Sequence, residues 1–164
     1  MTFMNVDRIL QVFNDCQVDY LLIGGMNFLL RHAANLTFDV DLWIDDTPEN
    51  RARCEDALTL LDAEWGATVA DWKPTKEFSP GWLENQVIYC LNSPAGAIDI
   101  FRSVTGLANW RDSAARSVSE TTQMGTRYRG ISDADMLACQ LVLEPGQRKM
   151  DRVTFLSQKG SSTP

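Results

Sequence analysis

Two short segments, Leu22-Ile23-Gly24-Gly25 and Phe38-Asp39-Val40-Asp41-Leu42, decide the fold. The first closes the apolar, β-rich run Val18 to Ile23, and its glycines end the predicted strand. The second alternates apolar and acidic residues, which predicts another strand over Phe38 to Ile44. A helix from Met26 to Ala34 is expected between them. The chain therefore begins its core with the order strand, glycine turn, helix, strand.

The acidic residues of the second segment share one side of the predicted strand. Successive side chains of a strand point to opposite faces, so Asp39 and Asp41 project together. Asp99 lies inside the apolar segment Ala97 to Phe101, where burying an acid is costly unless a cation or donors satisfy it. Such carboxylates form a hard-oxygen site that suits Mg²⁺, or Mn²⁺. The alternative, that these acids are merely solvated on half-exposed strands, stays open.

The glycine pair Gly24-Gly25 predicts a close approach of the backbone to a ligand. Glycine has no Cβ, and unpaired amides at a helix start point outward, so phosphate oxygens are suitable guests. The pair lacks the spacing of a P-loop or of a dinucleotide fingerprint. A simple joint between strand and helix is the alternative interpretation.

The rest of the chain predicts a single α/β (α+β) domain, residues 1–157, with a disordered tail at 158–164. Further strands are expected, of which the pair at 86–91 and 97–101 is antiparallel. A capping residue begins the helix at Thr47-Pro48, and Ser132 with Asp135 forms a similar start. The further helices expected are 6–16, 47–63, 132–143 and 146–157, and the further strands are 67–70, 86–91, 97–101 and 125–128.

Composition narrows the classes of function. Of the 164 residues, 45% are apolar, which is enough to form one hydrophobic core. The net charge of −7 repels polyanions. Non-specific binding of nucleic acid is therefore not expected. No leader-like opening and no run of about 20 apolar residues is present, so we expect a cytoplasmic protein without a membrane segment.

The cysteines and the histidine do not form a zinc motif. The one histidine is His32, and no Cys-x-x-Cys pair occurs among Cys16, Cys54, Cys90 and Cys139. Free thiols in a reducing compartment are the expected state of these cysteines.

The ordered motifs resemble those of a known family. Leu22 to Gly25, then Thr37 to Leu42, and later Ile98-Asp99-Ile100 are similar to the nucleotidyltransferase superfamily of DNA-polymerase-β-like fold. Ser132 to Cys139 is similar to the helix that follows the core in this family, so the resemblance covers about Val18 to Asp151. Small bacterial members of toxin–antitoxin and abortive-infection systems are the most similar in appearance, and antibiotic-modifying nucleotidyltransferases less so.

The resemblance implies a small mixed sheet packed with helices and followed by C-terminal helices. It also implies that the protein catalyses nucleotidyl transfer. A nucleoside monophosphate would pass from an NTP to a hydroxyl, with pyrophosphate leaving. Asp39 and Asp41 would hold two divalent ions, and Asp99 would hold the catalytic ion and favour deprotonation of the hydroxyl. Gly24 and Gly25 would cradle the triphosphate.

One departure from the family leaves other functions open. Relatives commonly place a lysine about where Gln140 stands and another basic residue near Met150. Arg148 and Lys149 are close enough to substitute at the triphosphate, and equally they could lie on a solvated helix start. A catalytically degenerate binding module and a subunit for a cognate toxin or antitoxin are the competing hypotheses. RNA, protein and small molecules are all compatible acceptors.

Overall fold

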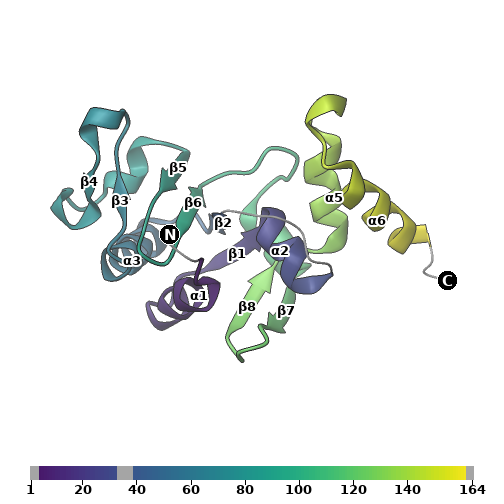
Figure 1. The fold of residues 1–164 in the computed structure, drawn as a ribbon, viewed down its shortest axis with the longest axis horizontal. Helices are drawn as coiled ribbons and strands as arrows, with labels where there is room; N and C mark the ends of the chain where they lie inside the picture. Colours follow the sequence, from purple (N-terminus) through teal and green to yellow (C-terminus); the bar gives the residue numbers. More distant parts are fainter. Residues whose placement is uncertain (1–3, 33–38, 162–164) are drawn as a thin grey trace.

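The computed structural model describes residues 4–32 and 39–161. A six-stranded mixed sheet runs in the order β5-β6-β2-β1-β8-β7, beside a two-stranded sheet of β3 and β4. Figure 1 shows the C-terminal helices α5 and α6 on the opposite side of the molecule from α3, β3 and β4. The strands are β1 (Tyr20–Ile23), β2 (Asp39–Ile44), β3 (Glu64–Trp65), β4 (Lys73–Pro74), β5 (Ile88–Leu91), β6 (Ala97–Phe101), β7 (Val118–Thr121) and β8 (Arg127–Gly130).

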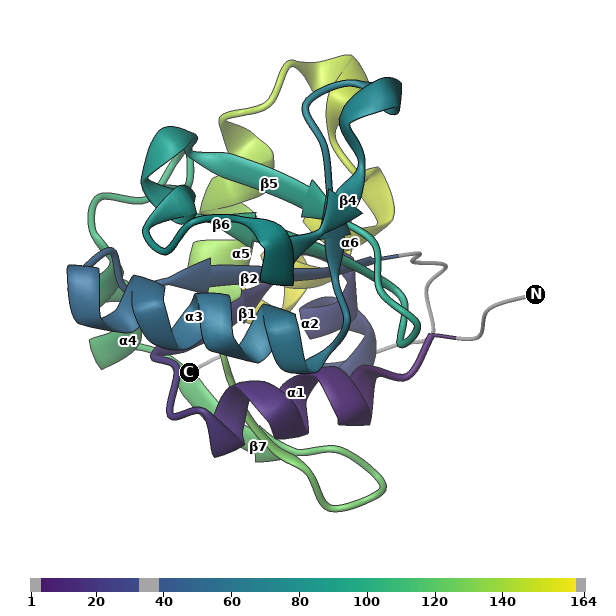
Figure 2. The same cartoon turned by 90° about the vertical axis from the view of Figure 1, so that its left-hand side faces the viewer.

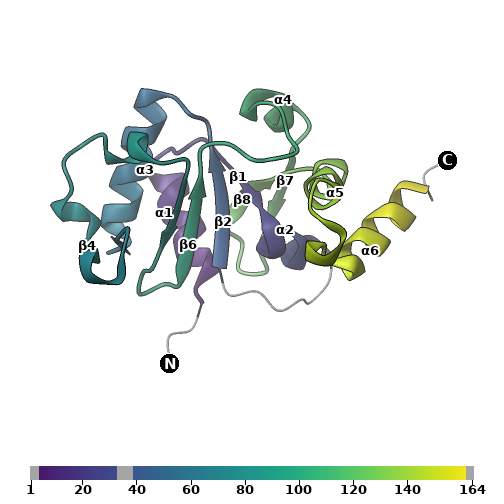
Figure 3. The same cartoon turned by 90° about the horizontal axis from the view of Figure 1, so that it is seen from above.

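Helices cover both faces of the large sheet. Figure 2 shows α1 and α3 in front of the sheet with α5 and α6 behind it, and Figure 3 shows the same layers from above. One apolar cluster, which includes Leu10 and Leu58, fills the space under α1 and α3. A second, which includes Ile23 and Met136, lies under α5 and α6. The helices are α1 (Val6–Asp15), α2 (Gly24–Arg31), α3 (Pro48–Leu60), α4 (Trp110–Ala115), α5 (Asp133–Leu141) and α6 (Met150–Ser161).

Side-chain caps fix where two of the predicted helices begin. The Thr47 hydroxyl accepts a hydrogen bond from the Asn50 amide at the start of α3, directly before Pro48. The Ser132 hydroxyl accepts one from the Asp135 amide at the start of α5. Both satisfy amides that the first helical turn leaves free, so the predicted starts are confirmed.

The register of the sheet brings distant parts of the sequence together. β1 pairs antiparallel with β2, which places Ile23 opposite Asp41. β2 pairs parallel with β6, which places Asp41 opposite Asp99. β5 pairs antiparallel with β6, as predicted, and places Cys90 opposite Asp99. Residues directly opposite one another share a face of the sheet, so the acids form a row.

The predicted strand at 67–70 is wrong. The strand β3 lies earlier, and Val69–Asp71 forms a 3₁₀ turn. The chain turns at Gly66, where an added Cβ would meet the backbone of Asp71 and Trp72. A side chain at Gly66 would prevent this close packing.

Other boundaries differ from the expectation. The strand predicted at 125–128 lies at Arg127–Gly130, and both α4 and its neighbour β7 were not predicted. α2 begins at Gly24, two residues before the expected start, while Ala34 and Thr37-Phe38 lie outside the described residues. The last helix begins at Met150 because Pro145–Gln147 forms a separate 3₁₀ turn, and it continues to Ser161, into the predicted tail. Residues 162–164 of that tail are outside the described part.

None of the helices in the described ranges has the length and apolarity needed to cross a membrane.

Candidate functional site

Three carboxylates converge on one face of the sheet. Asp39 and Asp41 come from β2 and Asp99 from β6, and all are half-buried. One oxygen from each lies within 4.8 Å of the others. The alternation of β2 gives Asp39 and Asp41 a common face, and the parallel register adds Asp99. The acids predicted to act together are thus placed together.

Ionising all three carboxylates of the cluster is unfavourable. Burial, followed by the charges of Asp39 and Asp99, raises the pKa of Asp41 to about 8. Burial, followed by the hydrogen bond and charge of Asp39, raises the pKa of Asp99 to about 6. The Oδ1 atom of Asp41 is buried and accepts no hydrogen bond from any described residue. A divalent cation bound by carboxylate oxygens relieves this situation, and the donor set fits Mg²⁺ or Mn²⁺.

Cys90 lies beside Asp99, a neighbour that the sequence did not indicate. Burial, then the charge of Asp99, raises the pKa of the exposed Cys90 thiol, so it stays protonated at neutral pH. A protonated thiol is a poor ligand for metals, which leaves the oxygen set as the candidate site.

Gly24 is required by the position of Asp41. Its φ is +69°, and an added Cβ would collide with the Oδ2 atom of Asp41. A side chain here would therefore push the carboxylate away from its neighbours. The sequence attributed this glycine to phosphate binding, and the structure adds a second reason, contact with a triad member.

The start of α2 is open toward this site. Ile23 occupies the N-cap position without a side-chain hydrogen bond, and Gly24 and Gly25 are the first helical residues. The free amides of a helix start, together with the helix dipole, favour an anion there. This arrangement fits the predicted cradle for phosphate.

We expect Gly24→Ala to weaken both the fold and metal binding. A left-handed φ costs a non-glycine residue about 1–2 kcal/mol, and the collision with Asp41 adds to this cost. Gly125→Ala is the matched control, because Gly125 also has a positive φ, +90°, with nothing within 4 Å of its added Cβ. Urea unfolding and Mg²⁺ titration should show a loss of affinity for Gly24→Ala alone, on the order of 10-fold. Equal behaviour of the two variants would contradict the contact.

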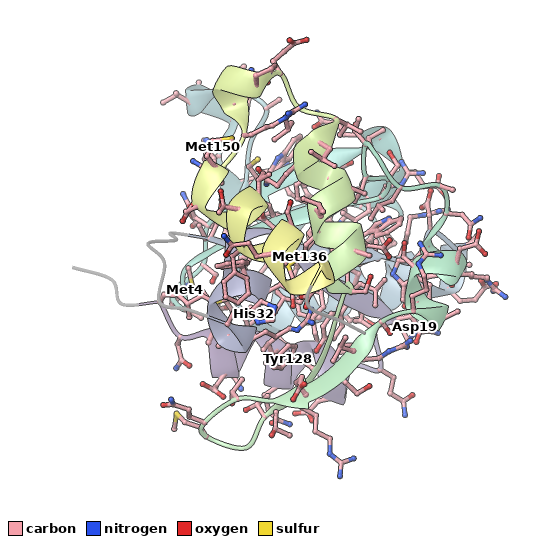
Figure 4. The ribbon with its side chains drawn as sticks, turned by 90° about the vertical axis from the view of Figure 1, so that its right-hand side faces the viewer. Met4, Asp19, His32, Tyr128, Met136 and Met150 are labelled. Carbon is pink, nitrogen blue, oxygen red and sulfur yellow. The ribbon has the colours of Figure 1, made fainter. Side chains whose placement is uncertain are left out.

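A cavity of about 280 Å³ opens beside Asp41 and Gly24. Its far side is formed by α5 and α6, which Figure 4 views from outside, with Met136 on α5 and Met150 at the start of α6. Most of the wall is apolar, as expected for a site that holds a ring system and a few polar groups. The apolar side chains include Phe28, Phe101, Val104, Met136, Leu143 and Leu156.

Among the described residues that line the cavity, Arg152 is the basic one. Its Nε is buried without an acceptor among the described residues, and its guanidinium lies 5.8 Å from the centre of the Phe28 ring. Its charge acts to lower the pKa of Asp41, although burial and the other acids outweigh it. Arg152 was not among the predicted site residues because the last helix was expected to begin at Gly146. The observed start at Met150 puts Arg152 in the first turn.

The basic residues that the sequence did select are placed differently. Arg148 donates hydrogen bonds to the carbonyls of Leu141 and Leu143, 2.9 and 3.1 Å away, and so closes the end of α5. Lys149 is exposed. Neither is among the residues that form this cavity wall. Their contact with a triphosphate stays a prediction.

Ion pairs hold α5 in position against the body. Arg31 and His32, at the end of α2, both contact a carboxylate oxygen of Asp133, at 2.9 and 2.7 Å. Arg116 binds the buried Asp135, two residues further along α5. These contacts fix the helix that carries part of the cavity wall.

Among the comparisons with known proteins, the one with solved structures supports the fold. The chain matches no protein-family model and no curated protein sequence. Its structure is similar to that of ANT(2")-Ia, an aminoglycoside nucleotidyltransferase solved in complex with adenylyl-2"-tobramycin. The TM-score is 0.61 at 11% sequence identity, over 94% of this chain and 86% of the other. The nucleotidyltransferase fold expected from the sequence is therefore confirmed.

Proposed function

We propose that this protein, which has the nucleotidyltransferase fold, transfers a nucleoside monophosphate from an NTP to a hydroxyl acceptor and needs Mg²⁺ to do so. One observation carries the proposal. Asp41 Oδ1 and Arg152 Nε are both buried without a partner in the described structure, and both residues border the same cavity. A buried carboxylate oxygen without a hydrogen-bond donor is stabilised by a cation, and a buried guanidinium N–H without an acceptor is stabilised by an anion. A phosphate bound with a divalent metal supplies both.

Each residue of the site has a role in this reaction. Asp39, Asp41 and Asp99 would hold Mg²⁺, which when bound neutralises phosphate charge and lowers the pKa of a hydroxyl. Gly24 and Gly25 would direct the first amides of α2 at the triphosphate. Arg152 would contact its phosphate oxygens, with Arg148 and Lys149 as candidates for outer contacts.

The proposed reaction forms one bond and breaks one. The acceptor oxygen attacks the α-phosphorus, and the bond from that phosphorus to the bridging oxygen breaks, so pyrophosphate leaves. Asp99 lies on the side of the triad next to β5 and accepts the proton of the hydroxyl. The apolar cavity wall excludes water that would compete as acceptor.

The competing function uses the same site without turnover. Gln140 stands where relatives commonly carry a lysine, which favours a module that binds nucleotide but does not transfer it. In that case a cognate toxin or antitoxin chain would be its partner. The two functions separate when α-labelled NTP is incubated with RNA, protein and small-molecule fractions of a cell extract. Label in one fraction, absent with Asp99→Asn, supports transfer, whereas tight Mg·NTP binding without label supports the module.

Replacing Arg152 should weaken nucleotide binding without destabilising the fold. Arg152→Gln removes a charge-assisted hydrogen bond, which corresponds to a 10- to 100-fold higher Kd for Mg·NTP, or about 1.5–3 kcal/mol. Arg148→Gln is the control, because Arg148 holds the carbonyls at the end of α5. It should lower the melting temperature and raise the Kd much less than Arg152→Gln does, because Arg148 is a candidate for an outer contact only. Calorimetric titration of both variants decides, and the reverse pattern would exclude Arg152 as the phosphate contact.

A further inference from the structure

Gln140 joins the wall of the cavity to the start of α6. Its Oε1 accepts a hydrogen bond from the backbone amide of Lys149 at 2.7 Å, and the side chain lines the cavity. Because an amide side chain is planar, this bond fixes which end is the acceptor and which end is the donor. The Nε2 group, with two N–H donors, has no acceptor among the described residues. The carbonyl end is therefore structural, and the donor end is available.

The residues around Gln140 indicate which kind of ligand atom its Nε2 group would bind. Arg152 follows Lys149 by three residues, about one helical turn, so the amide of Gln140 and the guanidinium belong to the same part of the wall. The wall also contains Asp41 and Gly24, with the open start of α2. A neutral donor near a cation and a helix start suits an oxygen of high negative charge.

We propose that Gln140 donates a hydrogen bond from Nε2 to a phosphate oxygen of the bound nucleotide and is a binding residue of the site. This inference rests on the proposed nucleotidyltransferase function. It assigns two tasks to one side chain, because Oε1 holds the turn into α6 while Nε2 binds the ligand. The absence of a lysine at this position then weakens the phosphate contact without removing it.

Two substitutions separate these tasks. Gln140→Glu keeps an acceptor for the Lys149 amide and has the same shape, but it loses the donor and adds a negative charge. Gln140→Met has a similar length and is neutral, and it provides neither a strong donor nor a strong acceptor. Gln140→Lys supplies a charged donor and loses the acceptor.

Calorimetric titration with Mg²⁺ and NTP, NDP, NMP or the phosphate-free nucleoside of one base tests the assignment. We expect the Kd for NTP to rise at least 10-fold in Gln140→Glu and about 3- to 10-fold in Gln140→Met. Gln140→Lys should bind NTP as tightly as wild type or more tightly. Without nucleotide, Gln140→Glu should melt like wild type, whereas the Met and Lys variants should melt about 2–4 °C lower.

Each outcome bears on the proposal. A loss that is present with NTP and small with NMP supports contact with the phosphate chain. A loss that is equal for NTP and NMP but absent with the nucleoside supports contact with the α-phosphate, whereas a loss that is equal for NTP and the nucleoside overturns the phosphate assignment. Wild-type affinity in both Gln140→Glu and Gln140→Met overturns the proposal while leaving the proposed function intact. Absence of Mg·NTP binding in the wild type overturns both, and the two failures are thus distinguished.

Discussion

Asp41→Asn should lower nucleotidyl transfer at least about 1,000-fold and, unusually for an inactivating change, stabilise the metal-free protein. Transfer is lost because an amide cannot supply the charge that holds a divalent ion with Asp39 and Asp99. Stability rises because burial, with the charges of Asp39 and Asp99, makes the ionised Asp41 costly and raises its pKa to about 8. At pH 8 we expect a gain on the order of 1–2 kcal/mol in the free energy of unfolding.

Asp46→Asn is the control with the opposite sign. Burial acts to raise the pKa of Asp46, but hydrogen bonds from Arg102 and Arg51 outweigh burial and hold this pKa below its ordinary value. Removing this paired charge should lower stability and leave transfer unchanged. Urea unfolding in EDTA, with transfer of α-labelled NMP, measures both effects. Loss of stability in Asp41→Asn would contradict the inference that the ionised Asp41 side chain destabilises the folded protein.

The stability of the metal-free protein should fall as pH rises from about 5 to 8. The folded pKa values of Asp41 and Asp99, about 8 and about 6, both lie above the ordinary value of 3.8. Between the unfolded and folded values the native state holds more protons than the unfolded state, so raising the pH favours unfolding. The effect is absent below the ordinary pKa, where both states are protonated. It reaches its full size above about pH 8, where the native state has also lost both protons.

Mg²⁺ should remove this slope, because the metal binds the ionised carboxylates and lowers their pKa values. Asp41→Asn should flatten the slope above pH 6 even without metal. Melting temperatures at several pH values, in EDTA and in Mg²⁺, provide the measurement. A profile that stays level or rises between pH 5 and 8 in EDTA would show that the triad does not carry buried charge.

The sequence predicted the centre of the fold because local rules and packing agree there. In β2, Val40 and Leu42 are fully buried while Asp39 and Asp41 share the other face, so alternation predicted the strand and the common face of its two acids. The helix caps at Thr47 and Ser132 were also predicted from local sequence, because the type of residue at a helix start is itself a signal. Asp99 on β6 was predicted to belong to the site because its neighbours in the sequence are apolar, and a buried charge among them is costly without a partner.

The sequence failed where local patterns are weak. β7 has three exposed residues out of four, so no alternation marks Val118–Thr121 as a strand. α4 is only six residues long and begins at a single cap, Asn109, so it offers too short a stretch for a helical pattern to show. Its position depends on Trp110, whose indole N–H donates to the carbonyl of Trp43, a contact between residues far apart in sequence. Such contacts leave no periodic signal.

The basic partner of the site was missed through an error in one helix boundary. With a start at Gly146, Arg148 and Lys149 occupy the first turn, whereas the observed start at Met150 makes Arg152 the residue that borders the cavity. Boundaries are the least reliable part of a reading from sequence. A shift of four residues along a helix is one turn, enough to exchange the basic residue that borders the site for another.

The most direct measurement is the melting temperature of the wild type and of Asp41→Asn in EDTA, in Mg²⁺, and in Mg²⁺ with each NTP. A ligand that binds only the native state must raise its stability, by about 2.7 kcal/mol at 100 times its Kd. We expect a rise with at least one NTP that requires Mg²⁺ and is absent from Asp41→Asn. No rise with any NTP, or an equal rise in Asp41→Asn, would contradict a metal and nucleotide site at Asp39, Asp41 and Asp99.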